Sequence, residues 1–167
     1  MSNTTLSVRR ASPESFGRFG TFVSAAEGAP FEAGAAAAYK EKVGVLDVGG
    51  ARVSVGVLNL KQRPLDFHEL ERHVATPELL VAVKGDVVFP VAPANQPQPT
   101  PEVGALEVFR LNQGEAVIMN AGVWHGLPFP LQGEATLLVV FKEGTPTADF
   151  QLSDTGKEQG RSFTIAL

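Results

Sequence analysis

The chain has 167 residues, of which 44% are hydrophobic and 19% are charged, and this composition predicts a globular protein with a sizeable core and excludes disorder throughout. Its 14 Lys and Arg residues against 18 Asp and Glu residues give a net charge of -4, which argues against a non-specific nucleic-acid binder. The absence of cysteine excludes disulfides, thiolate metal sites and a cysteine nucleophile.

The beginning of the chain does not resemble a targeting segment. Met1–Thr5 lacks a basic region followed by an apolar run, and the pair Arg9 and Arg10 is followed by Ala, Ser, Pro and Glu rather than by an apolar stretch. No segment approaches the roughly 20 apolar residues that cross a bilayer. We therefore expect a cytoplasmic protein without membrane contacts.

The first predicted element is a short helix. Ser12 can cap it, Pro13 suits its first position, and Glu14 suits its positive end. Phe16 would place an apolar side chain on its buried face. Residues 6–41 as a whole are predicted to be helical or irregular.

From residue 42 onward the pattern is typical of strands. Val53, Val55 and Val57 alternate with polar or small residues and would share one face. Further strands are expected at Leu79–Val83, Val87–Ala92, Leu106–Leu111, Ala116–Met119 and Ala135–Lys142. The four prolines between residues 93 and 104 predict a loop. We predict an all-β, mainly antiparallel fold, with one domain over 1–167 and its barrel or sandwich over 42–167.

Chemically active residues cluster in two stretches. In the first, Glu69, Glu71 and His73 would share one face of a strand, because side chains alternate, and Glu78 follows. His68, Leu70 and Arg72 would point to the other face, where we expect His68 to be structural. The second stretch runs from Gly114 to His125 and contains Asn120 and Trp124.

The spacing of these residues resembles the two sequence motifs of the cupin superfamily. Glu71, His73, Glu78 and Gly85 resemble the first motif, with Glu71 in place of the usual first histidine. The residues that resemble the second motif are Gly114, Asn120, Gly122 and His125, with Asn120 in place of proline and Phe129 in place of asparagine. The resemblance implies a cupin-like β-barrel or jelly roll.

Within the cupins, the chain resembles the ureidoglycolate lyases from about Leu6 to Lys142. The residues that carry the resemblance are Ser12–Phe16, Phe19-Gly20, Arg63-Pro64, Glu71-Arg72-His73 and Gly122-Val123-Trp124-His125. The chain departs from the family pattern at Val74, at Pro77-Glu78, at Gly126-Leu127-Pro128 and at Val140-Phe141-Lys142. The resemblance implies a carbon–nitrogen lyase that cleaves ureidoglycolate to glyoxylate and urea in allantoin breakdown.

The side chains of Glu71, His73, Glu78 and His125 would suit a divalent transition metal such as nickel, manganese or zinc, with open positions for a substrate. The metal would acidify the substrate hydroxyl, and Glu78 or His125 would protonate the leaving nitrogen. A metal-free route, in which His73, His125 and the glutamates exchange protons alone, stays open.

Four further residues are candidates for binding the substrate. Trp124 would form a pocket wall or fill the barrel, and Asn120 would contact the substrate or only turn the chain before Gly122. Arg63 and Lys142 would neutralise a substrate carboxylate or lie on the surface.

Two other functions remain open. One is a cupin enzyme acting on another small hydroxy or keto acid. The other is a non-catalytic cupin that binds a small metabolite, which an apolar cavity and histidines tied to backbone groups would favour. In each case the partner is a small molecule rather than nucleic acid or membrane, and we expect a homodimer, because cupins often pair through exposed strand edges.

Overall fold

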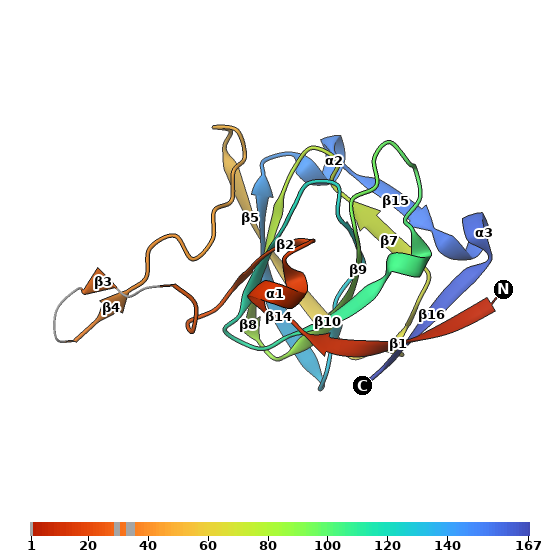
Figure 1. The fold of residues 1–167 in the computed structure, drawn as a ribbon, viewed down its shortest axis with the longest axis horizontal. Helices are drawn as coiled ribbons and strands as arrows, with labels where there is room; N and C mark the ends of the chain where they lie inside the picture. The colour runs from red at the N-terminus through yellow and green to blue at the C-terminus, as the bar shows by residue number, and fades with distance from the viewer. Residues whose placement is uncertain (1, 29–30, 33–35) are drawn as a thin grey trace.

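The computed structural model describes residues 2–28, 31–32 and 36–167, whose strands form two curled sheets and a small hairpin (Figure 1). The nine-stranded sheet has the order β15-β7-β12-β9-β10-β1-β16-β6, with β13 paired to β9. Its strands are β1 Ser2–Arg10, β6 Asp66–Phe67, β7 Glu69–Arg72, β9 Val87–Ala92, β10 Glu107–Leu111, β12 Trp124–His125, β13 Phe129–Pro130, β15 Gln151–Asp154 and β16 Arg161–Ala166.

The five-stranded sheet has the order β2-β11-β8-β14-β5, with every pairing antiparallel. Its strands are β2 Gly20–Val23, β5 Val53–Lys61, β8 Glu78–Lys84, β11 Ala116–Met119 and β14 Glu134–Lys142. The hairpin β3 Phe31–Glu32 and β4 Ala38–Tyr39 lies apart from both sheets (Figure 1). The helical turns are α1 Pro13–Phe16, η1 Val103–Ala105, α2 Thr145–Ala148 and α3 Thr155–Gln159.

Strand β9 explains how the core is divided. Its six residues are all buried, because apolar side chains pack against both of its faces. Phe89 and Val91 belong to a cluster between the two sheets, whereas Val88 and Ala92 belong to a second cluster on the opposite face of the nine-stranded sheet. The nine-stranded sheet is therefore covered on both sides at its centre.

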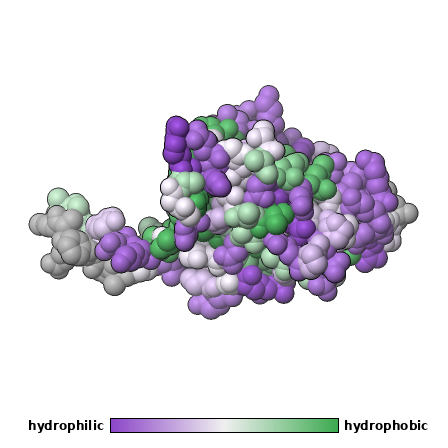
Figure 2. Space-filling model, turned by 90° about the horizontal axis from the view of Figure 1, so that it is seen from above, coloured by the Kyte–Doolittle hydropathy of each residue, from purple (hydrophilic) through white to green (hydrophobic). Residues whose placement is uncertain are grey.

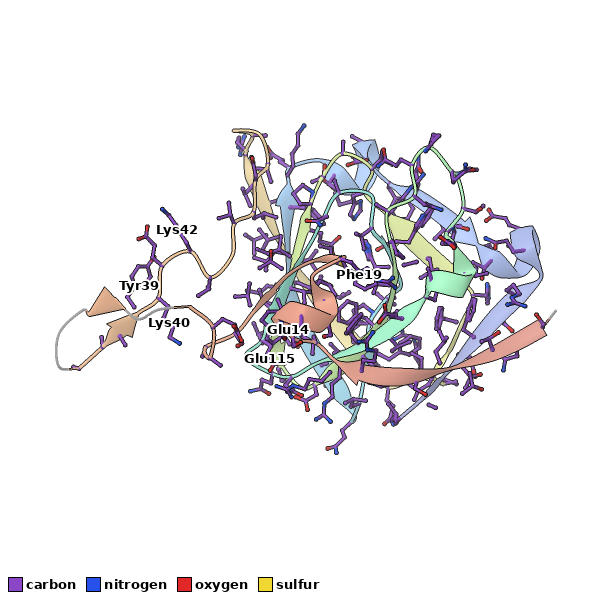
Figure 3. The ribbon with its side chains drawn as sticks, viewed as in Figure 1. Glu14, Phe19, Tyr39, Lys40, Lys42 and Glu115 are labelled. Atoms are coloured by element: carbon purple, nitrogen blue, oxygen red, sulfur yellow. The ribbon has the colours of Figure 1, made fainter. Side chains whose placement is uncertain are left out.

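The N-terminal segment also contributes to the core. Ser12 accepts a hydrogen bond from the backbone N–H of Ser15 and so caps α1, which places Phe16 among buried aromatic rings. Figure 3 shows Phe19 directed into the body beside α1, whereas Tyr39 and Lys42 lie on the outlying arm.

The prediction of a mostly β, mainly antiparallel fold is confirmed, with two differences. The segment 6–41, predicted to be helical or irregular, contains most of β1 and all of β2, although residues 29–30 and 33–35 lie outside the described part. Strand β1 pairs in parallel with both β10 and β16, so the nine-stranded sheet is mixed. In β1, Leu6 and Val8 are the side chains that pack on the second cluster. Two alternating apolar residues are too short a pattern to predict a strand from the sequence.

The face of the molecule seen in Figure 2 is mostly hydrophilic and carries hydrophobic patches on the body. Among the residues that the structure describes, no helix has the length and apolar character needed to cross a membrane.

Candidate active site

A cavity of about 240 Å³ lies between the two sheets. From the nine-stranded sheet, Glu71 of β7 and His125 of β12 face each other as a cross-strand pair, so their side chains point to the same side. His73 follows the end of β7 and lies on that side too, as the alternation of side chains predicted. Glu78, the first residue of β8, reaches the cavity from the five-stranded sheet.

The two histidines have defined orientations. Nδ1 of His73 lies 2.6 Å from the carbonyl oxygen of Asp149, and Nδ1 of His125 lies 3.2 Å from that of Val123. A carbonyl oxygen only accepts a hydrogen bond, so each Nδ1 carries a proton and donates it. Nε2 of each ring is therefore the atom that faces the carboxylates in the cavity.

The turn before β12 connects the two histidine-bearing segments. The backbone N–H of Gly122 donates a hydrogen bond of 2.6 Å to the carbonyl oxygen of His73. Gly122 has a φ of +82°, a conformation that favours glycine, and a Cβ atom there would lie 2.7 Å from the side chain of Gln96. This glycine therefore allows the turn that brings His125 beside His73.

The four candidate side chains form one ionic cluster that is largely buried. Nε2 of His73 lies 2.9 Å from Oε2 of Glu78, and Nε2 of His125 lies 3.4 Å from both Oε2 of Glu78 and Oε1 of Glu71. His73, Glu78 and His125 are buried, whereas the side chain of Glu71 is 35% exposed. Glu71 is thus the member of the cluster closest to solvent.

Charges in the cluster shift its pKa values strongly. Burial opposes the ionised form of Glu78, but the neighbouring His125 and His73 outweigh burial and lower the pKa of Glu78 to about 2. Burial also opposes the charged form of His125, yet Glu78 and Glu71 raise its pKa to about 10. The pKa of His73 is raised as well, because Glu78 and the Asp149 carbonyl outweigh burial.

The donor set fits a divalent metal. Glu71, His73 and His125 each offer a ligand atom, and these atoms lie within 4.8 Å of one another. Oε2 of Glu78 and Nε2 of His125 are buried and meet no strict hydrogen-bond geometry in the described part of the chain, although both lie within ion-pair distance of cluster members. Two imidazoles and two carboxylates with such loosely satisfied buried atoms are a donor set that a transition metal would suit.

A family model described as ureidoglycolate lyase matches residues 3–158 of the chain. The chain belongs to the ureidoglycolate lyase family. This family membership makes the chain a lyase, in agreement with the sequence-based prediction.

Individual relatives and solved structures are similar to parts of the chain. Proteins named ureidoglycolate lyase from Escherichia coli O1:K1 / APEC and Shigella boydii serotype 18 are each 26% identical over 109 residues, which cover 65% of this chain and 67% of the relative. A Bacillus subtilis oxalate decarboxylase matches 54% of this chain and 21% of its own, with a TM-score of 0.41 and 16% identity. Peruvianin-I from Thevetia peruviana matches 61% of this chain and 56% of its own, with a TM-score of 0.45 and 17% identity.

The four residues predicted to bind substrate do not line this cavity. Trp124 is fully buried in the second cluster, where its Nε1 donates a hydrogen bond of 2.9 Å to Oδ1 of Asn95. Because Trp124 and His125 are neighbours on a strand, only one of them can face the cavity. Of the two alternatives for Trp124, the structure shows the one in which it fills the core.

Arg63 and Lys142 also lie away from the cavity lining. The guanidinium of Arg63 donates to the carbonyl oxygens of Leu127 and Pro128 and lies 3.8 Å from the ring centroid of Phe129. Arg63 therefore contacts the segment that follows His125. Lys142 is exposed at the end of β14, as the surface alternative predicted.

Asn120 is exposed, and its backbone carbonyl accepts from the N–H of Val123 within the turn before β12. It turns the chain, which is the other role considered for it. His68 is half exposed and pairs with Asp154 at 3.0 Å outside the cavity.

Sequence reasoning missed the segment around α2. Asp149 accepts through its backbone from His73, and its carboxylate accepts from the backbone N–H groups of Val74 at 2.7 Å and Ala75 at 3.0 Å. Pro146 and Phe150 of the same segment line the cavity. The only pattern that could have indicated this segment is Phe150, an isolated aromatic residue in an otherwise polar stretch.

Proposed function

We propose that this chain cleaves ureidoglycolate to glyoxylate and urea. The observation that best supports the proposal is the buried cluster of Glu71, His73, Glu78 and His125, which faces a small cavity in a chain that belongs to the ureidoglycolate lyase family. Ureidoglycolate carries a hydroxyl and a ureido nitrogen on one carbon. Removing the hydroxyl proton and protonating that nitrogen breaks the C–N bond and leaves an aldehyde.

The pKa values suggest which group performs each proton transfer. Glu78, with a pKa lowered to about 2, stays ionised and holds both histidines, so it does not suit the role of general acid. His125, with a pKa raised to about 10, holds the proton that the leaving nitrogen needs. Glu71 lies 3.4 Å from His125, takes up the hydroxyl proton and returns a proton to His125.

The same residues would hold a divalent metal through Glu71, His73 and His125. When bound, nickel, manganese or zinc would supply Lewis acidity toward the hydroxyl and carboxylate of the substrate. With a metal bound, His73 and His125 would be neutral ligands, oriented by the hydrogen bonds that their Nδ1 atoms donate to backbone carbonyls. Chelation therefore distinguishes the two routes.

Release of urea and glyoxylate from fresh ureidoglycolate tests the proposal. The protein is assayed as purified, after chelation, and after addition of nickel, manganese or zinc, with His125→Ala and His73→Ala as the blanks for spontaneous decay. His68→Ala is the matched control, because this histidine pairs with Asp154 outside the cavity. The proposal is supported if activity is lost in His73→Ala and His125→Ala but kept in His68→Ala. It is refuted if the unmodified protein is no faster than the two blanks.

The non-catalytic alternative is less well supported by the orientation of the histidines. Both are tied to backbone carbonyls, but only through Nδ1, and Nε2 of each faces the carboxylates in the cavity. Nε2 of His125 lies near two carboxylates and Nε2 of His73 near one, and burying these charges would cost free energy without benefit to a histidine whose role is only structural.

We further propose that residues 1–167 form one cupin-like domain that pairs into a cytoplasmic homodimer, without nucleic-acid or membrane partners. Support for pairing comes from β5, the last strand of its sheet, whose outward Val53, Val55 and Val57 are 50%, 63% and 64% exposed. Sedimentation equilibrium tests this assembly, and Val55→Lys would reduce dimerisation if β5 lies in the interface.

A further inference from the structure

The cavity is polar at one end only. Among the residues that line it, all of which the structure describes, the only polar side chains are Glu71, His73, Glu78 and His125. The rest of the wall is formed by apolar residues that include Leu58, Leu127, Val139, Phe141, Pro146 and Phe150. No lysine or arginine is among the lining residues.

The apolar wall begins beside the reacting groups and continues to the mouth. The ring centroids of Phe141 and Phe150 lie 5.7 and 6.3 Å from that of His73. Phe150 and Leu127 are 45% and 50% exposed, although both line the cavity. Large apolar side chains left in contact with water at a cavity mouth mark a place where an apolar ligand group would be buried favourably.

This wall does not match a bare ureido group. With the carboxylate and hydroxyl of a 2-hydroxyglycine unit at the polar end, the nitrogen substituent extends along the apolar wall. Both kinds of substrate carry an N–H and a carbonyl next to the reacting carbon, but a ureido group ends in an NH2, whose two N–H donors would lie against side chains that offer no partner. An acyl group with an apolar substituent would instead place carbon atoms against Phe141 and Phe150.

We propose that the preferred substrates of this chain are N-acyl-2-hydroxyglycines with an apolar acyl group, R–CO–NH–CH(OH)–COO⁻. This inference rests on the proposed function, because the reacting unit is the same. The C–N bond breaks, the hydroxyl proton leaves, a C=O bond forms, and the nitrogen takes up a proton. The products are glyoxylate and the amide R–CO–NH₂, with no oxidant or reductant required.

The test compares kcat/KM for glyoxylate release from ureidoglycolate, N-acetyl-2-hydroxyglycine and N-benzoyl-2-hydroxyglycine, with His125→Ala as the blank. We expect at least one acyl substrate to exceed ureidoglycolate by roughly tenfold or more, the scale of discrimination that an apolar pocket gives. A ureidoglycolate value equal to or above both acyl values overturns the inference and leaves the proposed function standing. No enzymatic glyoxylate from any of the three overturns both.

Two variants test the role of the wall itself. Phe150→Ser removes an apolar group at the mouth and should reduce the ratio of acyl to ureido kcat/KM. Val83→Ser is the matched control, because Val83 is an apolar side chain that is 42% exposed and does not line the cavity. An unchanged ratio in Phe150→Ser, or an equal fall in Val83→Ser, contradicts the assignment of the apolar wall to substrate selection.

Discussion

Glu71, Arg72 and His73 are consecutive in sequence but belong to two different polar environments on opposite faces of the nine-stranded sheet. Arg72 is buried, donates hydrogen bonds to Gln151 at 2.9 Å and to the carbonyl of Gln98 at 2.8 Å, and stacks over the ring of Trp124. On the cavity face, by contrast, His125 and Glu78 are held mainly as an ion pair at 3.4 Å, and Nε2 of His125 makes no hydrogen bond within the described part of the chain. The polar groups around Arg72 are satisfied by hydrogen bonds within the fold, whereas the cavity face gathers charged groups that can also bind a ligand.

The largest expected effect is on the cavity face. Glu78→Gln removes the charge that holds both histidines, so kcat/KM should fall by about 10²- to 10⁴-fold, the scale of a lost acid–base function. The free energy of unfolding should fall as well, because the lowered pKa of Glu78 means that its ionised form stabilises the folded state. Steady-state kinetics together with urea denaturation measure both quantities, and an equally active Glu78→Gln protein would contradict the assignment.

The next effect is expected on the opposite face. Arg72→Ala leaves the Gln98 carbonyl and the Gln151 side chain unpaired and removes the stacking on Trp124. We expect the free energy of unfolding to fall by about 2–3 kcal/mol, since hydrogen bonds to buried charged groups are involved. Urea denaturation measures the loss. Retention of wild-type stability would show that the two faces do not differ as described.

The pH dependence of stability sharpens the comparison, because the strongly shifted buried groups lie on the cavity face. The raised pKa of His125 contributes stability that is fully present below 6.5 and is lost as the pH rises through about 10. The lowered pKa of Glu78 contributes stability that is present above 4.5 and is lost as the pH falls toward 2. The free energy of unfolding, measured in the presence of a chelator, should therefore be greatest between pH 4.5 and 6.5. In His125→Asn, the free energy of unfolding should fall less steeply as the pH rises toward 10.

The smallest effect is expected at Asn95, at the edge of the satisfied network. Its Oδ1 accepts from Nε1 of Trp124 at 2.9 Å and lies 3.4 Å from Nη1 of Arg72. Asn95→Ala should lower the free energy of unfolding by about 1 kcal/mol and leave kcat/KM within experimental error of wild type. A loss of activity larger than the loss of stability would mean that this network reaches the cavity.

Local sequence patterns predicted much of the fold. The strands Val87–Ala92 and Ala116–Met119 were predicted with their observed bounds, because each is a Val-rich or apolar run that ends at a turn. Strand β1 was missed because its sequence is mostly Ser, Thr, Asn and Arg. Its parallel pairings depend on partners far along the chain, which no local pattern reveals.

For the candidate site, alternation and motif spacing located the four central side chains but not the rest of the wall. The same alternation places Trp124 on the face opposite to His125, so the sequence contained the argument against a pocket role for it. Phe150 and Asp149 reach the site through the pairing of β15 with β7, a contact between segments that lie far apart in the chain.

The backbone hydrogen bond from Gly122 to His73 links the segment that carries His73 to the turn that leads to His125, so a movement of one segment would displace the other. A residue with a Cβ at Gly122 would be strained at a φ of +82°, and relaxation of the turn would reach His73 through its carbonyl and His125 through the strand that follows. The relative position of the two imidazoles therefore depends on the backbone of this turn as well as on their own side chains.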